Sequence, residues 1–373
     1  MKKKKSISLD ILIPVAAVLV ALIVGGIIIA ATGSNPFKAY RALLQGCGFL
    51  PKSSYGASSN MLTDFLNYAN YFTPMIFAAL AVAVALKAGL FNIGVSGQML
   101  AAGFIATIVV GYSSLNAVIA KPLVILIGAA VGGLAGAVVG FLKYRFNINE
   151  VVSTIMFNYI FQYVDSFFIN TYFVDTVTRQ SVTINQAARL TLLDVQLGRL
   201  KAVIPLGLIL ALVAVVYVRY LFSKTVLGYE IRAVGMSKTA AQYAGINVGR
   251  TVVLSMTISG VLAGLAGVTY YLGYAGSIQP KVLVDTGYDA IAVSLLGNNN
   301  PVGIVISTLL VSLVNNGSAY MKSQAGVESE IASVILGIIL VFSASNAFIK
   351  RWLVLKRSSK EQAITAADQK GEK

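Results

Sequence analysis

The sequence predicts an all-α fold, a polytopic integral membrane protein with about ten transmembrane helices that include short or broken ones. Of its 373 residues, 57% are hydrophobic and 12% are charged, whereas soluble globular proteins carry about 25% charged residues. Apolar runs recur along the chain, and the basic residues cluster at their ends, as topology signals do. The net charge of +15 is therefore explained by membrane orientation, and we expect no nucleic-acid partner.

The predicted spans, in chain order, are Ile11–Ala31, Tyr71–Leu86, Met99–Gly111, Pro122–Leu142, Val151–Tyr172, Ala202–Phe222, Thr251–Leu272, Asp285–Leu296, Val302–Tyr320 and Ile331–Phe348. The second, third and eighth are short for a crossing helix of about 20 residues, so we expect half-helices or re-entrant segments there. An even number of spans places both termini on one side, and the basic clusters at 2–5 and 350–357 place that side in the cytoplasm. The chain thus divides into a basic tail at 1–10, a transmembrane domain at 11–350 and a charged tail at 351–373.

The lysine-rich start and the apolar run Ile11–Ala31 form a pattern that signal peptides share. The run is about 20 residues long, which is enough to cross a bilayer, and no A-x-A-like cleavage site follows it. We therefore predict a retained first helix. A polar external loop with a short surface helix is expected at Asn35–Asn70.

The stretch KAGLFNIGVSGQM, Lys87–Met99, separates two apolar runs with glycines and hydrogen-bonding side chains. Irregular backbone at membrane depth is tolerated only where protein covers it or a water-filled cavity meets it. Broken helices near the midplane form substrate sites in transporters. We expect this break to face a translocation pathway; the alternative is a cytoplasmic loop between two helices.

The span Pro122–Leu142 carries glycines at four-residue spacing, which places them on one helix face and allows another helix to approach closely. They are Gly128, Gly132, Gly136 and Gly140. Two interpretations are open, namely packing within the chain and a subunit interface.

The span Val151–Tyr172 is rich in aromatic side chains, which suit a membrane-interface belt, although some could stack on a planar ligand. Asp165 is the one acid well inside a predicted span. It is either a functional intramembrane carboxylate or a hydrated group near the outer interface. The polar segment Asp175–Lys201 that follows is a candidate docking surface for an external partner.

The cytoplasmic segment at 223–250 contains two short predicted helices, Tyr229–Val234 and Lys238–Tyr243, which end near Gly245. Small side chains would let such a pair dock flat into a groove on a partner protein. These are Ala233, Ala240, Ala241 and Ala244. The alternative is a plain connecting loop.

The stretch DTGYDAIAVSLLGNNNP, Asp285–Pro301, is a second short apolar piece between polar, turn-forming residues. Asp285 and Asp289 are four residues apart and share a helical face. Two interrupted segments, one in each half of the chain, are the best sequence indicator of a transport site in a pseudo-symmetric transporter.

Three ordered motifs resemble those of permease subunits of bacterial ABC importers for nucleosides and related simple sugars, in the branched-chain amino acid and simple-sugar permease superfamily. The first, GLFNIGVSGQ at 89–98, looks like the family hallmark, although relatives usually carry Glu where this chain has Ser96. The second, EIRAVGMSKTAAQYAGINVGR at 230–250, is similar to the loop that docks on the ATPase subunit. The third is TGYDAIAVSLLGNNNP at 286–301. The resemblance covers roughly residues 60–348 and is strongest to nucleoside-type permeases.

This resemblance implies a transport subunit that is not itself an enzyme. Two separate ATPase domains would use ATP and Mg, and the sequence holds no G-x-x-x-x-G-K-[ST] phosphate loop of its own. A second permease subunit, often a different chain, and an extracytoplasmic nucleoside-binding protein, often a lipoprotein, are implied as partners at a bacterial plasma membrane. The single cysteine and the absence of histidine exclude a Cys/His metal site, and we expect no cofactor bound by this chain.

The resemblance also implies positions for the pathway and for the coupling to the ATPase. We hypothesise that amides bond ribose hydroxyls or base edges and that Phe91 stacks on a base. The predicted pathway residues are Phe91, Asn92, Ser96, Gln98, Asp289 and Asn298. The predicted coupling residues are Tyr229, Glu230, Arg232, Ala233, Gly235, Ala240, Ala241 and Gly245.

Other functions stay open on the sequence alone. One is an ABC permease for a simple sugar such as ribose. Another is an ion-coupled secondary transporter, which would need intramembrane carboxylates or a histidine relay, whereas this chain has no histidine. A membrane-embedded enzyme would need a nucleophile–base or metal constellation, and the sequence offers none.

Overall fold

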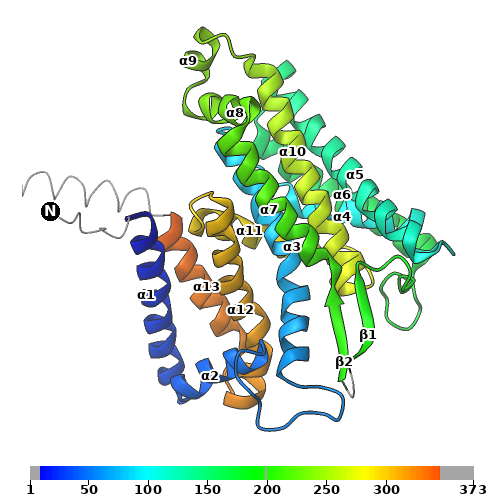
Figure 1. The fold of residues 1–373 in the computed structure, drawn as a ribbon, viewed down its shortest axis with the longest axis vertical. Helices are drawn as coiled ribbons and strands as arrows, with labels where there is room; N and C mark the ends of the chain where they lie inside the picture. Colours follow the sequence, from blue (N-terminus) through cyan, green and yellow to red (C-terminus); the bar gives the residue numbers. More distant parts are fainter. Residues whose placement is uncertain (1–8, 198–199, 345–373) are drawn as a thin grey trace, which may run out of the picture.

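The computed structural model describes residues 9–197 and 200–344, and the regular structure within them is almost entirely helical (Figure 1). The predicted tails lie outside the described residues, apart from the first two residues of α1. The helices are α1 (Leu9–Ala31), α2 (Pro36–Gly46), α3 (Met61–Lys87), α4 (Val95–Ala106), α5 (Ala117–Phe146), α6 (Glu150–Phe168), α7 (Leu206–Lys224), α8 (Val226–Met236), α9 (Lys238–Tyr243), α10 (Val248–Thr269), α11 (Thr286–Leu296), α12 (Pro301–Ala325) and α13 (Ser329–Ala344). Three π-helical turns, η1 (Thr107–Gly111), η2 (Ile169–Phe173) and η3 (Tyr270–Ala275), extend α4, α6 and α10. Each of the ten predicted spans corresponds to one of these helices.

Helix α3 is longer than predicted, because it begins at Met61 and not at Tyr71. A capping box starts it: the Asn60 side chain accepts the Thr63 N–H at 3.0 Å, and Thr63 Oγ1 accepts the Asn60 N–H at 2.9 Å. The external loop expected at Asn35–Asn70 therefore ends at residue 60, and α2 is the short helix predicted within it. At 27 residues, α3 is a full crossing helix and not a half-helix.

Five helices are long and apolar enough to cross a membrane among the residues described, namely α3, α5, α7, α10 with η3, and α12. The second half of α1 and α2 form a pair bent by 118° that adds a sixth span if it is one broken crossing. Shorter apolar stretches are Val95–Gly111, α11, and Glu330–Ile339 within α13. The third and eighth predicted spans are therefore short, as expected.

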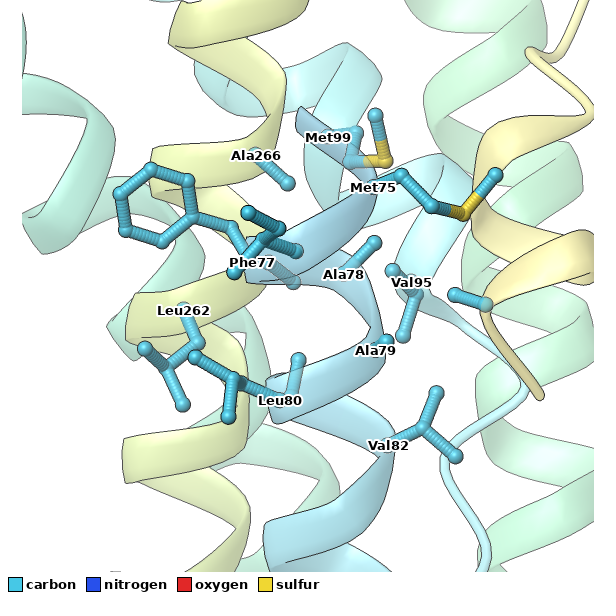
Figure 2. Packing of buried hydrophobic residues seen from close by; sticks show 14 of the residues in the cluster. Met75, Phe77, Ala78, Ala79, Leu80, Val82, Val95, Met99, Leu262 and Ala266 are labelled. Atoms are coloured by element: carbon cyan, nitrogen blue, oxygen red, sulfur yellow. The ribbon is translucent and has the colours of Figure 1, made fainter. Parts of the chain in front are cut away.

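The core surrounds α3, which lies in the middle of the bundle (Figure 1). Side chains of α3, α4 and α10 pack in one buried cluster, among them Phe77, Met99 and Leu262 (Figure 2). The small side chains Ala78 and Ala79 let the neighbouring helices approach α3 closely.

The glycine stripe of α5 packs against α10. A methyl group at Gly132 would lie 2.2 Å from the Gly260 carbonyl oxygen, and one at Gly264 would lie 1.9 Å from the Gly128 carbonyl oxygen. The two backbones are therefore in contact, which only glycine allows. Packing within the chain, one of the two open interpretations, accounts for the stripe. α10 approaches α4 in the same way, because a methyl at Gly267 would lie 2.1 Å from the Met99 carbonyl oxygen.

A β-hairpin, β1 (Thr191–Leu197) with β2 (Leu200–Pro205), lies at the end of the bundle opposite α8 and α9 (Figure 1). It adds a two-stranded antiparallel element to the predicted all-α fold and occupies the first residues of the span predicted at Ala202–Phe222. α7 therefore begins at Leu206. The sequence carries part of the signal for the hairpin, since apolar and polar residues alternate at 193–197, directly before a Gly-Arg pair.

Candidate functional site

The break at 87–99 turns the chain between α3 and α4. α3 ends at Lys87, Gly89 has φ +70°, and α4 starts at Val95. The three polar side chains of the break point into the protein: Asn92, Ser96 and Gln98 are 1%, 0% and 1% exposed. Protein therefore covers the irregular backbone, which is one of the two conditions that such backbone requires at membrane depth.

Asn92 organises this break through its side-chain amide. Its Nδ2 donates to Gln98 Oε1 at 3.0 Å and to Ser259 Oγ at 2.9 Å, and its Oδ1 accepts the Gly94 N–H at 3.0 Å. Ser259 Oγ donates in turn to the Ala81 carbonyl at 2.7 Å. The network ties the break to α10 and to the body of α3.

Asn158 of α6 holds the start of α4. Its Oδ1 accepts the Gly97 N–H at 2.8 Å, and its Nδ2 donates to the Ile93 carbonyl at 3.1 Å. The first bond satisfies an N–H group that a helix start leaves without an intrahelical partner, and the second pairs a carbonyl of the break. Neither Asn158 nor Ser259 was identified from the sequence; their only signal is a polar side chain within an apolar span.

Ser96 joins the break to the start of α11. Its Oγ donates to the Val284 carbonyl at 2.9 Å. A methyl group at Gly287 would lie 2.3 Å from Ser96 Oγ, so the backbone of α11 packs directly against α4. The two interrupted segments recognised in the sequence are thus in contact.

The segment predicted to couple to the ATPase forms the two expected helices. α8 is longer than Tyr229–Val234 at both ends, and α9 has the predicted bounds. Thr225 caps α8 by accepting the Gly228 N–H at 3.0 Å, and Ser237 caps α9 by accepting the Ala240 N–H at 3.3 Å.

The predicted coupling residues divide by exposure. Ala241 is 3% exposed and packs against the chain itself, so its side chain supports α9 from within. Glu230 and Ala233 are half-buried. The exposed ones are Tyr229, Arg232, Gly235, Ala240 and Gly245.

Gly235 places the end of α8 against the end of α3. A methyl group at Gly235 would lie 2.1 Å from the Lys87 carbonyl oxygen and 3.0 Å from the Gly89 nitrogen. The exposed segment and the start of the break are therefore in backbone contact.

A cavity of about 480 Å³ lies between α3, η3, α11, α12 and α13; we call it the central cavity. Its lining comprises Tyr71, Tyr270, Asp285, Thr286, Asp289, Ala292, Val311, Asn315, Ser333, Leu336, Gly337 and Ile339. Asn315 Nδ2 donates to Asp289 Oδ2 at 2.9 Å. Tyr71 lies ten residues from the start of α3 and sixteen from its end, about 15 Å and 24 Å along the axis, so the cavity is closer to the start of α3 than to the break.

A second cavity of about 490 Å³, the basic cavity, lies at the α8 end of the bundle. It is lined by Lys87, Arg219, Phe222, Ser223, Arg232 and the connection from Asn298 to Val302. That connection turns sharply, with Asn298 and Asn299 at φ 55° and 51°. Gly297 and Gly303 meet there at backbone distance, since a methyl at Gly303 would lie 2.4 Å from the Gly297 carbonyl oxygen.

The structure separates the predicted pathway residues into three places. Asp289 lines the central cavity together with Asp285, as their shared helical face predicts. Asn298 lines the basic cavity. The remaining four lie in the break, where three belong to its hydrogen-bond network and Phe91 is half-buried. Their role in a pathway stays a prediction. Tyr71, Tyr270 and Asn315 were not identified from the sequence, because they become neighbours only through the fold.

Asp165 of α6 is 4% exposed, and its Oδ2 has no hydrogen-bond partner among the described residues. The hydrated position considered for it is therefore not observed. Several aromatic rings of the same helix, including Tyr159, Tyr163 and Phe167, are more than half exposed, as an interface belt requires.

Comparison with known proteins matches residues 65–344 to the family described as the permease component of branched-chain amino acid transport systems. A nucleoside ABC transporter permease protein of Lactococcus lactis is 35% identical, over 97% of this chain and 98% of that protein. A guanosine ABC transporter permease protein of Bacillus subtilis is also 35% identical, over 91% and 94%. A glucose ABC transporter permease protein of Haloferax volcanii is 30% identical, over 91% and 89%.

Proposed function

This chain belongs to the permease-component family of branched-chain amino acid transport systems, and we propose that it forms the membrane pathway for nucleosides in an ATP-driven importer. It is a multi-pass membrane subunit and not an enzyme. The observation that carries the nucleoside assignment is the 35% identity, over nearly the whole chain, to permeases named for nucleosides and for guanosine.

The importer contains further subunits. Two ATPase domains use ATP and Mg on the cytoplasmic side, a second permease of a different sequence completes the pathway, and an extracytoplasmic nucleoside-binding lipoprotein delivers the solute. The chain lies in a bacterial plasma membrane with both termini in the cytoplasm. Basic residues at both chain ends support this orientation, and the exposed α8–α9 surface supports docking of an ATPase.

A series of close contacts supports a route for mechanical coupling. α8 touches the end of α3 at Gly235, the break joins α3 to α4, and Ser96 of α4 bonds the Val284 carbonyl just before α11. α11 then carries Asp289 into the central cavity. Movement of α8 by a docked ATPase would reach the cavity through these contacts, because close-packed protein interiors have low compressibility and transmit strain.

The central cavity forms the middle of the pathway. Its position beside the short, interrupted segment α11 supports this assignment, because transporters bind substrates at such helix breaks. The basic cavity is the exit towards the cytoplasm. α3, α11 with its following turn, and α12 contribute residues to both cavities, so the two lie along one column of the bundle.

The test is uptake of labelled purine and pyrimidine nucleosides, ribose and glucose by cells with and without the gene. We expect loss of nucleoside uptake only, abolished by ATP depletion and retained with a protonophore at constant ATP. Loss of sugar uptake alone would assign the permease to sugars, a substrate class to which the Haloferax relative points. Uptake that follows the protonophore and not ATP would overturn the importer.

A further inference from the structure

The central cavity has an unusual charge for the middle of a membrane protein. Asp285 and Asp289 both line it, and its lining includes no lysine or arginine among the described residues. Neither carboxylate belongs to an ion pair among the described residues, in which the pairs are Lys52–Asp64, Lys143–Glu150 and Lys322–Glu328. Carboxylates at membrane depth are expensive, and they are usually retained for a function.

Asp289 is held in a defined position. Asn315 Nδ2 donates to its Oδ2 at 2.9 Å, and burial of about half or more of each side chain limits their motion. A carboxylate has about four acceptor positions, and Asn315 uses one. The remaining positions suit a pair of neighbouring hydroxyl donors, which a carboxylate accepts side by side through charge-assisted hydrogen bonds.

The rest of the lining suits a planar, weakly polar group. Tyr71 and Tyr270 contribute aromatic rings, and Tyr274 supports both with ring centroids at 5.2 Å and 5.8 Å. Leu336, Ile339 and Val311 lie among the α12 and α13 residues of the lining. The volume of about 480 Å³ lies within the range of about 300–1,000 Å³ that is typical of small-molecule sites.

We propose that the central cavity is a binding site for uncharged nucleosides, in which Asp289, held by Asn315, accepts hydrogen bonds from sugar hydroxyls while the two carboxylates exclude phosphorylated nucleosides. This inference rests on the proposed function and gives it a selectivity mechanism. A phosphate group carries about −1.5 to −2 charges at pH 7. Two carboxylates without basic partners in the lining, Asp289 half-buried and Asp285 exposed, therefore repel it by like charge.

Two buried hydroxyls lie on α12 between the residues that line the two cavities. Thr308 and Ser312 are fully buried and have no hydrogen-bond partner among the described residues. They lie four residues apart on α12, and Asn315 follows on the same helical face. The residues at the start of α12 line the basic cavity, so polar groups mark the helix between the two cavities.

The test measures the charge of the cavity directly, because uptake selectivity also reflects the delivering protein. Ser333→Cys places a thiol on the α13 wall, in a Cys47→Ser background that removes the native thiol. The chain is expressed with its natural partner subunits. Membranes are treated with a cationic or an anionic methanethiosulfonate reagent, and each rate is normalised to that of a free thiol.

We expect the cationic reagent to react at least roughly fivefold faster than the anionic one, as two nearby carboxylates predict. Asp289→Asn should reduce this ratio, and the matched control Glu328→Gln, which removes an exposed carboxylate outside the cavity, should leave it unchanged. Guanosine at millimolar concentration should slow modification, whereas guanosine monophosphate should not. Asp289→Asn should also abolish the protection by guanosine.

Equal reaction of both reagents, equal protection by guanosine and its monophosphate, or no reaction at all would each overturn the inference. If nucleoside uptake by the unsubstituted complex is normal in that case, the proposed function stands without it. Absence of nucleoside uptake by the unsubstituted complex would instead overturn the proposed function, and with it the assignment of nucleosides to this cavity.

Discussion

The contact between α8 and the end of α3 can be tested with a single methyl group. In Gly235→Ala the new Cβ would lie 2.1 Å from the Lys87 carbonyl oxygen, whereas ordinary contacts begin at 3.4 Å. α8 must therefore retreat by roughly 1 Å, and forced overpacking of this kind costs about 1–3 kcal/mol. If this energy destabilises the state in which α8 contacts α3 during transport, the transport rate decreases by roughly five- to 150-fold.

The assay is ATP-dependent nucleoside uptake, measured with ATP hydrolysis and the amount of assembled complex in the same membranes. We expect nucleoside uptake to fall while ATP hydrolysis and assembly of the complex persist, because α8 remains folded but no longer contacts the end of α3. The control is Gly26→Ala in α1, outside the α8–α9 segment, where the atom nearest the new methyl is the Tyr40 hydroxyl at an ordinary contact distance of 3.6 Å. Unchanged uptake in Gly235→Ala, at normal assembly, would refute the contact as the coupling route. Loss of the assembled complex would show that the contact serves folding instead.

Three other predictions follow from the contacts described. Asn92→Leu removes hydrogen bonds to Gln98, Ser259 and Gly94 and should destabilise the protein by about 2–4 kcal/mol. The measurement is the thermal unfolding midpoint of the purified complex, with the exposed substitution Asn67→Leu as the control. Equal midpoints for the two variants would contradict the hydrogen-bond network. Gly264→Ala should prevent accumulation of folded protein in the membrane, because its methyl group would lie 1.9 Å from the Gly128 carbonyl oxygen. The control is Gly337→Ala, whose methyl group meets nothing within 4 Å. Similar membrane yields of the two variants would show that α5 and α10 separate easily. The hydrogen bond from the Val177 N–H, together with one from Thr178, lowers the pKa of Asp175, so the turn gains stability above the ordinary pKa of about 4 and loses it as pH falls through the lower folded value. Amide hydrogen exchange at Val177, corrected for intrinsic rates, should accelerate in that acidic range. A corrected exchange rate that does not change with pH would refute the role of the Asp175 carboxylate in stabilising this turn.

Most helices were predictable because apolar runs and glycines are local signals. The start of α3 was not, because residues 61–70 are polar enough to resemble a loop, and their helical state depends on the Asn60–Thr63 capping box and on burial of Tyr68. The hairpin was missed because only its first strand alternates, whereas its second strand merges into the apolar run of α7. Periodicity over a few residues competes poorly with a long apolar run beside it.

The candidate site was predictable in part. Asp285 and Asp289 share a face by helical spacing alone, and both reach the central cavity. Asn315 is 26 residues further along the chain, and Tyr71 is more than 200 residues away. No sequence period relates residues so distant, so only the packing of α3, α11 and α12 brings them together. For the same reason the break could be recognised from its glycines and polar side chains, but the partners Asn158 and Ser259 could not.

The glycine contacts of α10 determine which parts of the protein are able to move. Helices that touch through their backbones have no side-chain rotamers to exchange, so α4, α5 and α10 behave as one stiff body. α11 rests on α4 at Gly287 and belongs to the same body. In the opposite wall of the central cavity, α12 meets the end of α11 at the Gly297–Gly303 backbone contact near the basic cavity. Further along, the Asp289–Asn315 hydrogen bond joins the same two helices. The Gly297–Gly303 contact is therefore placed to act as a hinge for α12 and α13. The Asp289–Asn315 hydrogen bond is the contact that breaks when these helices move away from α11.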